Sequence, residues 1–111
     1  MSIEFDYSFE KFGRAFHDLA ASNDSLKERL LRAFDHIGRV RERDVPKELR
    51  EQFLGISERI RSGKPQNREG TSQATVNQIT DGEAVKIAED IVSFNEELLR
   101  WSNRDSETKS V

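Results

Sequence analysis

The chain has 111 residues, of which 34% are hydrophobic and 35% charged, so it has room for one domain with a lean core. It holds no cysteine, which excludes a disulfide framework, a thiolate nucleophile and a cysteine-ligated zinc site. No stretch approaches the roughly 18 consecutive apolar residues of a membrane span. Residues 1–6 are acidic and lack an apolar signal core, so we expect a cytoplasmic protein.

The formal net charge of −3 is unevenly distributed along the chain. Residues 1–24 carry two basic and five acidic side chains, which gives −3. Residues 27–64 carry eleven basic and seven acidic side chains, which gives +4, and residues 81–97 carry one basic and six acidic side chains, which gives −5. An acidic overall balance disfavours general binding to nucleic acids or anionic membranes, which requires clustered positive charge. The alternating sign favours oppositely charged helices that lie side by side.

Two helices are predicted over residues 8–40 from apolar residues that recur at steps of three and four. The first begins near Ser8, and the second follows Ser25, whose hydroxyl forms a capping box with Glu28. The two apolar stripes are Phe5, Phe9, Phe12, Phe16 and Leu19 in the first helix, and Leu26, Leu30, Ala33, Ile37 and Val40 in the second.

A third helix is predicted to begin at Asp44 and Pro46, because aspartate suits an N-cap and proline suits the first helical turn. Residues 62–65, Ser-Gly-Lys-Pro, end it. Its apolar stripe is Val45, Leu49, Phe53, Ile56 and Ile60. Glycines at positions 13, 38 and 55 lie inside the three predicted helices, where each costs about 1 kcal/mol relative to alanine. They indicate a close approach of two backbones or a bend.

Residues 63–80 are mostly polar and show no helical or alternating period, so they are predicted to form a long loop. This loop is long enough either to cap the bundle or to run along it, which would make the next helix parallel to the third. Thr80 and Glu83 form a second capping box, which opens a fourth helix that runs to about Ser102. Residues 103–111 contain no apolar run and are expected to be a flexible tail.

The expected fold is therefore an all-α four-helix bundle whose first three helices are antiparallel. It forms a single helical domain over residues 1–102, and the long loop at about 63–80 precedes the fourth helix.

The predicted fourth helix carries more apolar surface than one buried face requires. At 100° per residue its apolar residues span an arc of about 200°, against roughly 100° for a helix with one buried face. Asn95 falls inside this arc, where an amide either bonds to a neighbouring backbone or sets the register across a dimer axis. The helix is therefore either the central element of the bundle or half of an interface. The candidate interface residues are Val85, Val92, Asn95, Leu99 and Trp101.

No complete catalytic or metal-binding set is recognisable, so we expect no catalytic, cofactor-binding or metal-binding residues. His17 and His36 lie away from the apolar stripes, without an acidic residue or second histidine one turn away on the same face. Glu48 and Glu51 supply half of the paired-carboxylate arrangement with which helical nucleotide phosphohydrolases hold magnesium, but the fourth helix lacks the second pair. A magnesium-dependent phosphohydrolase is the least favoured alternative.

Arginine-rich segments close the predicted second and third helices. Helix dipoles favour such cations without any ligand, and no aromatic residue is interleaved for base stacking. These segments keep nucleic-acid binding as an alternative function. Their basic residues are Arg39, Arg41, Arg43, Arg59, Arg61 and Lys64.

The sequence therefore favours a small non-enzymatic helical module for protein–protein interaction, with an adaptor or regulatory role. Its expected partner is a second copy bound through the fourth helix, another protein, or both. Nucleic acid is not the favoured partner, and neither a cofactor nor a membrane is expected. No family resemblance is specific enough to name.

Overall fold

The computed structural model describes residues 5–66 and 69–109, with the side chains of residues 105–109 excepted. These residues form five α-helices and two 3₁₀ helices and contain no strand, so the predicted all-α class is confirmed. In chain order the elements are α1 (Asp6–Ala20), α2 (Leu26–Ile37), η2 (Glu42–Asp44), η3 (Lys47–Leu49), α3 (Arg50–Ile60), α4 (Thr71–Gln78) and α5 (Asp81–Lys109).

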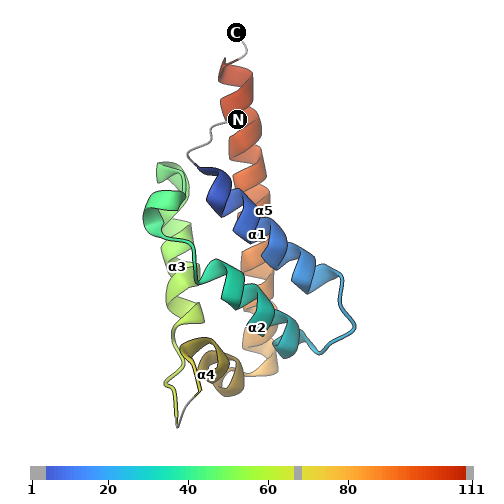
Figure 1. Cartoon of the computed structure of the whole chain (residues 1–111). Coiled ribbons are helices and arrows are strands. Elements are labelled where there is room, and N and C mark those ends of the chain that lie inside the picture. The colour runs from blue at the N-terminus through green and yellow to red at the C-terminus, as the bar shows by residue number, and fades with distance from the viewer. Residues whose placement is uncertain (1–4, 67–68, 110–111) are drawn as a thin grey trace.

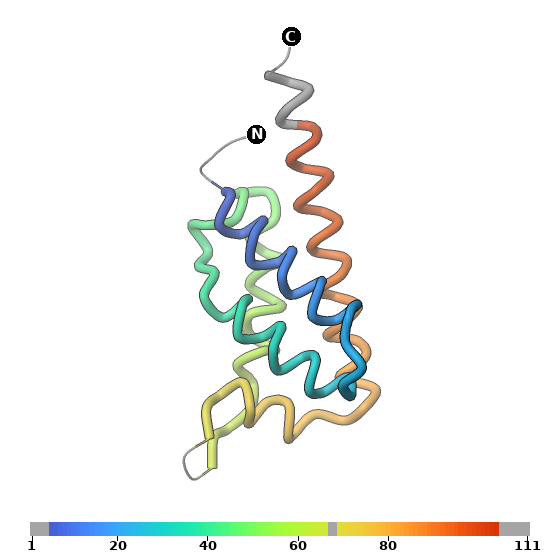
Figure 2. Tube along the Cα trace, turned by 45° about the vertical axis from the view of Figure 1, so that its right-hand side comes forward, coloured from blue at the N-terminus to red at the C-terminus, as the bar shows by residue number. Residues whose placement is uncertain are grey.

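The long helix α5 forms the spine of the molecule. α1, α2 and α3 alternate in direction, and α5 runs antiparallel to α3 (Figures 1 and 2). α5 packs against α1, α2 and α3, whereas the short α4 packs against α2 and α3 at one end of the bundle. Residues 63–66 and 69–80 therefore cap this end rather than run along the side. The far end of α5 projects beyond the other helices, so the molecule measures 54 × 27 × 20 Å.

The helix α4 lies inside the predicted loop, so the prediction of four helices and an irregular segment over residues 63–80 is wrong. Its sequence shows little amphipathic periodicity because a polar residue, Thr75, is buried together with Ala74 and Val76. Burial of this short segment against α2 and α3 stabilises a helix that its own sequence pattern does not indicate.

Two helix boundaries also differ from the prediction. Pro46 precedes the 3₁₀ helix η3, and regular α-helix begins only at Arg50 rather than at Asp44–Pro46. α5 continues to Lys109, well past the predicted end at Ser102, because residues 103–109 contain neither glycine nor proline. Residues 110 and 111 of the expected tail lie outside the described residues. Although α5 has 29 residues, no helix in the described part of the chain is long and apolar enough to cross a membrane.

Helices start at both predicted capping boxes, but only the second box is complete. The Oγ of Ser25 accepts a hydrogen bond from the backbone N–H of Glu28 at 3.2 Å, which starts α2. At the start of α5 the exchange is reciprocal: the N–H of Glu83 donates to Oγ1 of Thr80, and the N–H of Thr80 donates to Oε1 of Glu83, both at 3.1 Å. These bonds satisfy backbone donors that a helix start leaves unpaired.

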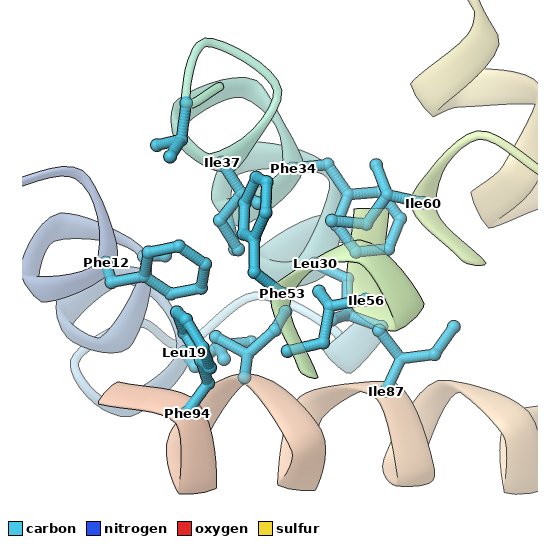
Figure 3. Packing of buried hydrophobic residues seen from close by; sticks show 14 of the residues in the cluster. Phe12, Leu19, Leu30, Phe34, Ile37, Phe53, Ile56, Ile60, Ile87 and Phe94 are labelled. Carbon is cyan, nitrogen blue, oxygen red and sulfur yellow. The ribbon is translucent and has the colours of Figure 1, made fainter. Parts of the chain in front are cut away.

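Three phenylalanine rings form the centre of the core where α1, α3 and α5 meet. The ring centroids of Phe12 and Phe94 are 4.6 Å apart, and that of Phe53 lies 6.2 Å from Phe12 and 6.1 Å from Phe94. Figure 3 shows the rings of Phe12 and Phe94 directed toward each other from facing helices. Aromatic pairs at such separations contribute more than their buried area alone. The core therefore ties the first and last helices together.

A buried contact between Gly63 and Thr75 attaches α4 to the end of α3. Thr75 Oγ1 accepts a hydrogen bond from the N–H of Gly63 at 2.9 Å and donates one to the carbonyl oxygen of Ile60 at 2.6 Å. A Cβ on Gly63 would lie 2.1 Å from the backbone nitrogen of Thr75, so only glycine allows this approach. At Gly13 and Gly55 a Cβ would meet no neighbouring atom within 4 Å, so the predicted close approach does not occur there.

Candidate interaction surface

The helix α5 has two apolar faces: the other described residues bury one of them and cover the second only in part. The buried face consists of Ala84, Ile87, Ile91, Phe94 and Leu98. The second face, called here the α5 row, consists of Val85, Ala88, Val92, Asn95 and Leu99. Val85 is 46% exposed and Leu99 55%, whereas the other three residues of the row are half-buried. The predicted wide arc is therefore divided into a buried half and a half that faces solvent.

An open groove of about 490 Å³, called here the α5 groove, lies between the α1–α2 connection and the first half of α5. Its mostly apolar lining includes one basic and one acidic side chain, Arg29 and Glu89, which come from opposite walls. Leu26 and Val92 also pack against the core, which links the groove to the interior. The full lining is Leu19, Leu26, Arg29, Val85, Ala88, Glu89, Val92 and Ser93.

Arg29 is held in the wall of the α5 groove by backbone groups. Its Nη1 donates to the carbonyl oxygen of Leu19 at 2.6 Å, and its Nε donates to that of Asp24 at 3.0 Å. These bonds tie α2 to the end of α1. Because both acceptors are neutral, the guanidinium brings a positive charge to the groove.

A second arginine stabilises the same connection from its outer side. Arg32 forms an ion pair with the Asp24 carboxylate, to which Ser22 Oγ also donates a hydrogen bond at 3.1 Å. Two hydrogen bonds hold the pKa of Asp24 below its usual value: the one from Arg32 has the larger effect and the one from Ser22 the smaller. The α1–α2 connection that forms one wall of the groove is therefore anchored at several points.

Phe16 is a further exposed apolar side chain, on α1. Phe9, seven residues earlier on the same face of α1, has its ring 6.4 Å from that of Trp101 on α5. That face of α1 therefore points toward α5, and Phe16 on it is 39% exposed. α1 therefore also carries an exposed aromatic side chain on the face that it turns toward α5.

The five predicted interface residues lie in two different environments. Trp101 contacts other parts of the chain: its ring meets that of Phe5 edge-on at 5.2 Å, and its Nε1 donates to Oε2 of Glu48 at 2.6 Å. It therefore holds the start of α1 and the 3₁₀ helix η3 against α5. The α5 row contains the other four residues, Val85, Val92, Asn95 and Leu99.

The two arginine-rich segments do not form one surface. Residues 39–43 lie near the start of α3, and residues 59–64 lie at its other end, about 16 Å away for an 11-residue helix. Arg39, just after α2, pairs with Asp35 of that helix at 3.7 Å, and Arg59 pairs with Asp90, which joins α3 to α5. The remaining exposed basic residues are Arg41, Arg43, Arg61 and Lys64.

Of the other titratable candidates, Glu48 and His36 contact other helices of the chain, whereas Glu51 and His17 are exposed. Glu48 accepts the hydrogen bond from Trp101, and Glu51 is exposed on α3. His36 Nε2 lies 3.0 Å from Oδ2 of Asp18, which links α2 to α1, and His17 is exposed. Within residues 5–66 and 69–104, no three or more histidine and carboxylate side chains gather in a way that could hold a metal ion.

The α5 groove could not be predicted from periodicity. Leu19 and Leu26 belong to the predicted apolar stripes of their helices. The spacing of such a stripe shows which side of a helix is covered, but it does not show where the covering helix ends. The break at residues 21–25 is the one local signal, because a turn there leaves both leucines at the edge of the core.

Comparison of the chain with models of known protein families finds no match. Neither the curated proteins nor the solved structures contain a protein that matches it significantly.

Proposed function

We propose that this protein is a small non-enzymatic module for protein–protein interaction, with an adaptor or regulatory role, and that it forms homodimers through the α5 row. The exposure of Val85 and Leu99 on a helix whose other face already supplies the core carries this proposal. Single exposed apolar residues are normal, but these two share one helical face, and an apolar groove opens along part of that face. An exposed apolar helical face beside a groove is typical of an interface.

The energetics favour an association that depends on concentration. A twofold axis repeats every contact, so each exposed side chain is removed from water twice. Full burial of a valine or leucine contributes about 1.5–3 kcal/mol. Association costs at least about 4 kcal/mol in lost translational and rotational freedom. The dimer therefore requires most of the α5 row to be covered, and it is expected to dissociate on dilution.

The test is the molar mass in solution, measured by light scattering coupled to size-exclusion chromatography over a range of concentrations. We expect a dimer at tens of micromolar protein and a monomer for Leu99→Glu, because the substitution places a charge in the proposed interface. Leu99 is more than half exposed, so this variant is expected to retain its fold, which circular dichroism checks.

Leu54→Glu is the matched control. Leu54 is 39% exposed on α3, away from the α5 row, so its replacement by glutamate leaves the dimer intact if the interface is specific. A wild-type protein that stays monomeric at tens of micromolar contradicts self-association. Equal loss of the dimer in both variants contradicts the assignment of the interface to α5.

A further inference from the structure

We propose that the two copies pack with their α5 helices antiparallel about a twofold axis at Asn95, so that Leu99 of each copy enters the α5 groove of the other. This inference rests on the proposed self-association and adds its geometry. Three features of α5 support this geometry: the positions of Leu99 and of the α5 groove, the positions of opposite charges beside the α5 row, and the position of Asn95.

Asn95 is the midpoint of α5, which runs from Asp81 to Lys109. Antiparallel helices centred on it therefore overlap along their whole length, and residues at equal distances before and after position 95 face each other. Leu99 lies four positions after the centre. It therefore faces the part of the partner helix four positions before the centre, at position 91. At that level the helix presents Ala88 and Val92, two lining residues of the α5 groove.

The shapes of the two sites match this register. Leu99 is the most exposed of the large apolar side chains that the structure describes, and it projects from a part of α5 outside the groove. The α5 groove is open and mostly apolar, with a volume of about 490 Å³ that accommodates a leucine side chain. A side chain of one helix that fits between residues of the facing helix is the usual packing of paired helices. The twofold axis repeats the contact, so both leucines and both grooves are used.

The charges beside the α5 row are also complementary in this register. Glu89 lies six positions before Asn95 and Arg100 five positions after it, and both project on the same side of the row at 100° per residue. Antiparallel pairing brings equal sides of the two helices together, so Glu89 faces Arg100 of the partner subunit. Arg100 is reachable, since its side chain is 66% exposed in its present ion pair with Glu97.

Asn95 is suited to the position on the axis. It is half-buried on the otherwise apolar α5 row, and an amide both donates and accepts hydrogen bonds. Two such amides that meet on a twofold axis satisfy each other, whereas a shifted register places each amide against apolar side chains. Single asparagines at such seams select one register at some cost in stability.

Disulfide formation tests the orientation, because the chain contains no cysteine of its own. Glu89→Cys and Arg100→Cys are prepared as separate proteins, mixed, allowed to exchange subunits and oxidised. We expect a cross-linked dimer from the mixture and none from either variant alone. Two copies of position 89 lie twelve residues, or about 18 Å, apart along antiparallel helices centred on Asn95, which is too far for a disulfide.

Glu58→Cys mixed with Arg100→Cys controls for random collisions, since Glu58 is exposed on α3. A dimer whose Glu89→Cys and Arg100→Cys mixture gives no more cross-link than this control overturns the antiparallel pairing and leaves self-association intact. A monomeric wild-type protein overturns both.

Charge reversal is an independent measurement on uncrosslinked protein. Glu89→Arg and Arg100→Glu are each expected to raise the dimer Kd about two- to tenfold, because each places like charges opposite one another in two symmetric contacts. The double variant Glu89→Arg/Arg100→Glu restores the pair with reversed polarity and is expected to return the Kd toward the wild-type value. Additive losses in the double variant contradict the contact.

Discussion

At the scale of single residues, the contact between Gly63 and Thr75 decides where the chain goes after α3. The backbone of Gly63 touches that of Thr75 so closely that a methyl group does not fit between them. The Gly63→Ala variant is therefore expected to lose about 1–3 kcal/mol of unfolding free energy, the usual cost of overpacking, in urea denaturation. The opposite sign is expected for Gly55→Ala, which gains up to about 1 kcal/mol because an alanine there meets no neighbour. A loss of stability at both positions would contradict the steric explanation.

The hydroxyl of Thr75 makes a separate contribution to the same contact. The Thr75→Val variant keeps the shape of the side chain but lacks its hydroxyl. The buried N–H of Gly63 and the carbonyl of Ile60 therefore lose the hydroxyl as their hydrogen-bond partner. An unsatisfied buried group costs about 1–3 kcal/mol, so this variant is expected to unfold at lower urea concentration. Thr75→Ser, which keeps the hydroxyl, is expected to retain more of the wild-type stability than Thr75→Val. Equal stabilities of the two variants would show that the hydrogen bonds contribute little.

The exposed pair of Asp24 and Arg32 predicts a pH dependence. Hydrogen bonds from Arg32 and then Ser22 lower the pKa of Asp24 in the folded chain. A carboxyl with a lower pKa when folded adds stability above the usual aspartate pKa of about 4, and that stability is lost as the pH falls through the folded value. NMR titration of the Asp24 carboxyl is expected to give a pKa below the usual one in the wild type and a higher one in Arg32→Gln. Arg14→Gln, which removes the partner of Glu10 instead, serves as the control.

At the scale of elements, Trp101 of α5 holds together the start of α1 and the 3₁₀ helix η3. This residue is the single tryptophan of the chain, so its fluorescence reports on the contact with Phe5 and Glu48 without labelling. Glu48→Ala removes the acceptor of the indole N–H, and we expect the emission to shift to longer wavelength as water replaces the carboxylate. Glu51→Ala, one turn away, is expected to leave the emission unchanged. Identical spectra in all three proteins would contradict the contact.

The elements also show which sequence signals are reliable. The capping residues Ser25 and Thr80 start α2 and α5 where they were predicted, because a cap is a local hydrogen bond between residues three positions apart. The start of α3 and the whole of α4 were mispredicted, because both depend on neighbours distant in sequence. Proline at position 46 permits a helix start but leads instead into the 3₁₀ helix η3.

At the scale of the whole molecule, the proposed pairing predicts an overall shape. The chain is 54 Å long, and antiparallel helices that overlap along their full length add width rather than length. Small-angle X-ray scattering of the dimer is therefore expected to give a maximum dimension well short of twice that of the Leu99→Glu monomer. A dimer of about twice the monomer length would indicate contact through the ends of the molecule instead.

The all-helical class, the direction of the first three helices and the excess of apolar surface on the last one could be predicted from the sequence alone. These properties follow from local spacing and capping, which act over a few residues. The burial of Thr75, the contacts of Trp101 with other parts of the chain and the exposure of Val85 and Leu99 on the α5 row could not be predicted in this way. Burial depends on which helix covers which face, and that is set by contacts between residues far apart in the chain.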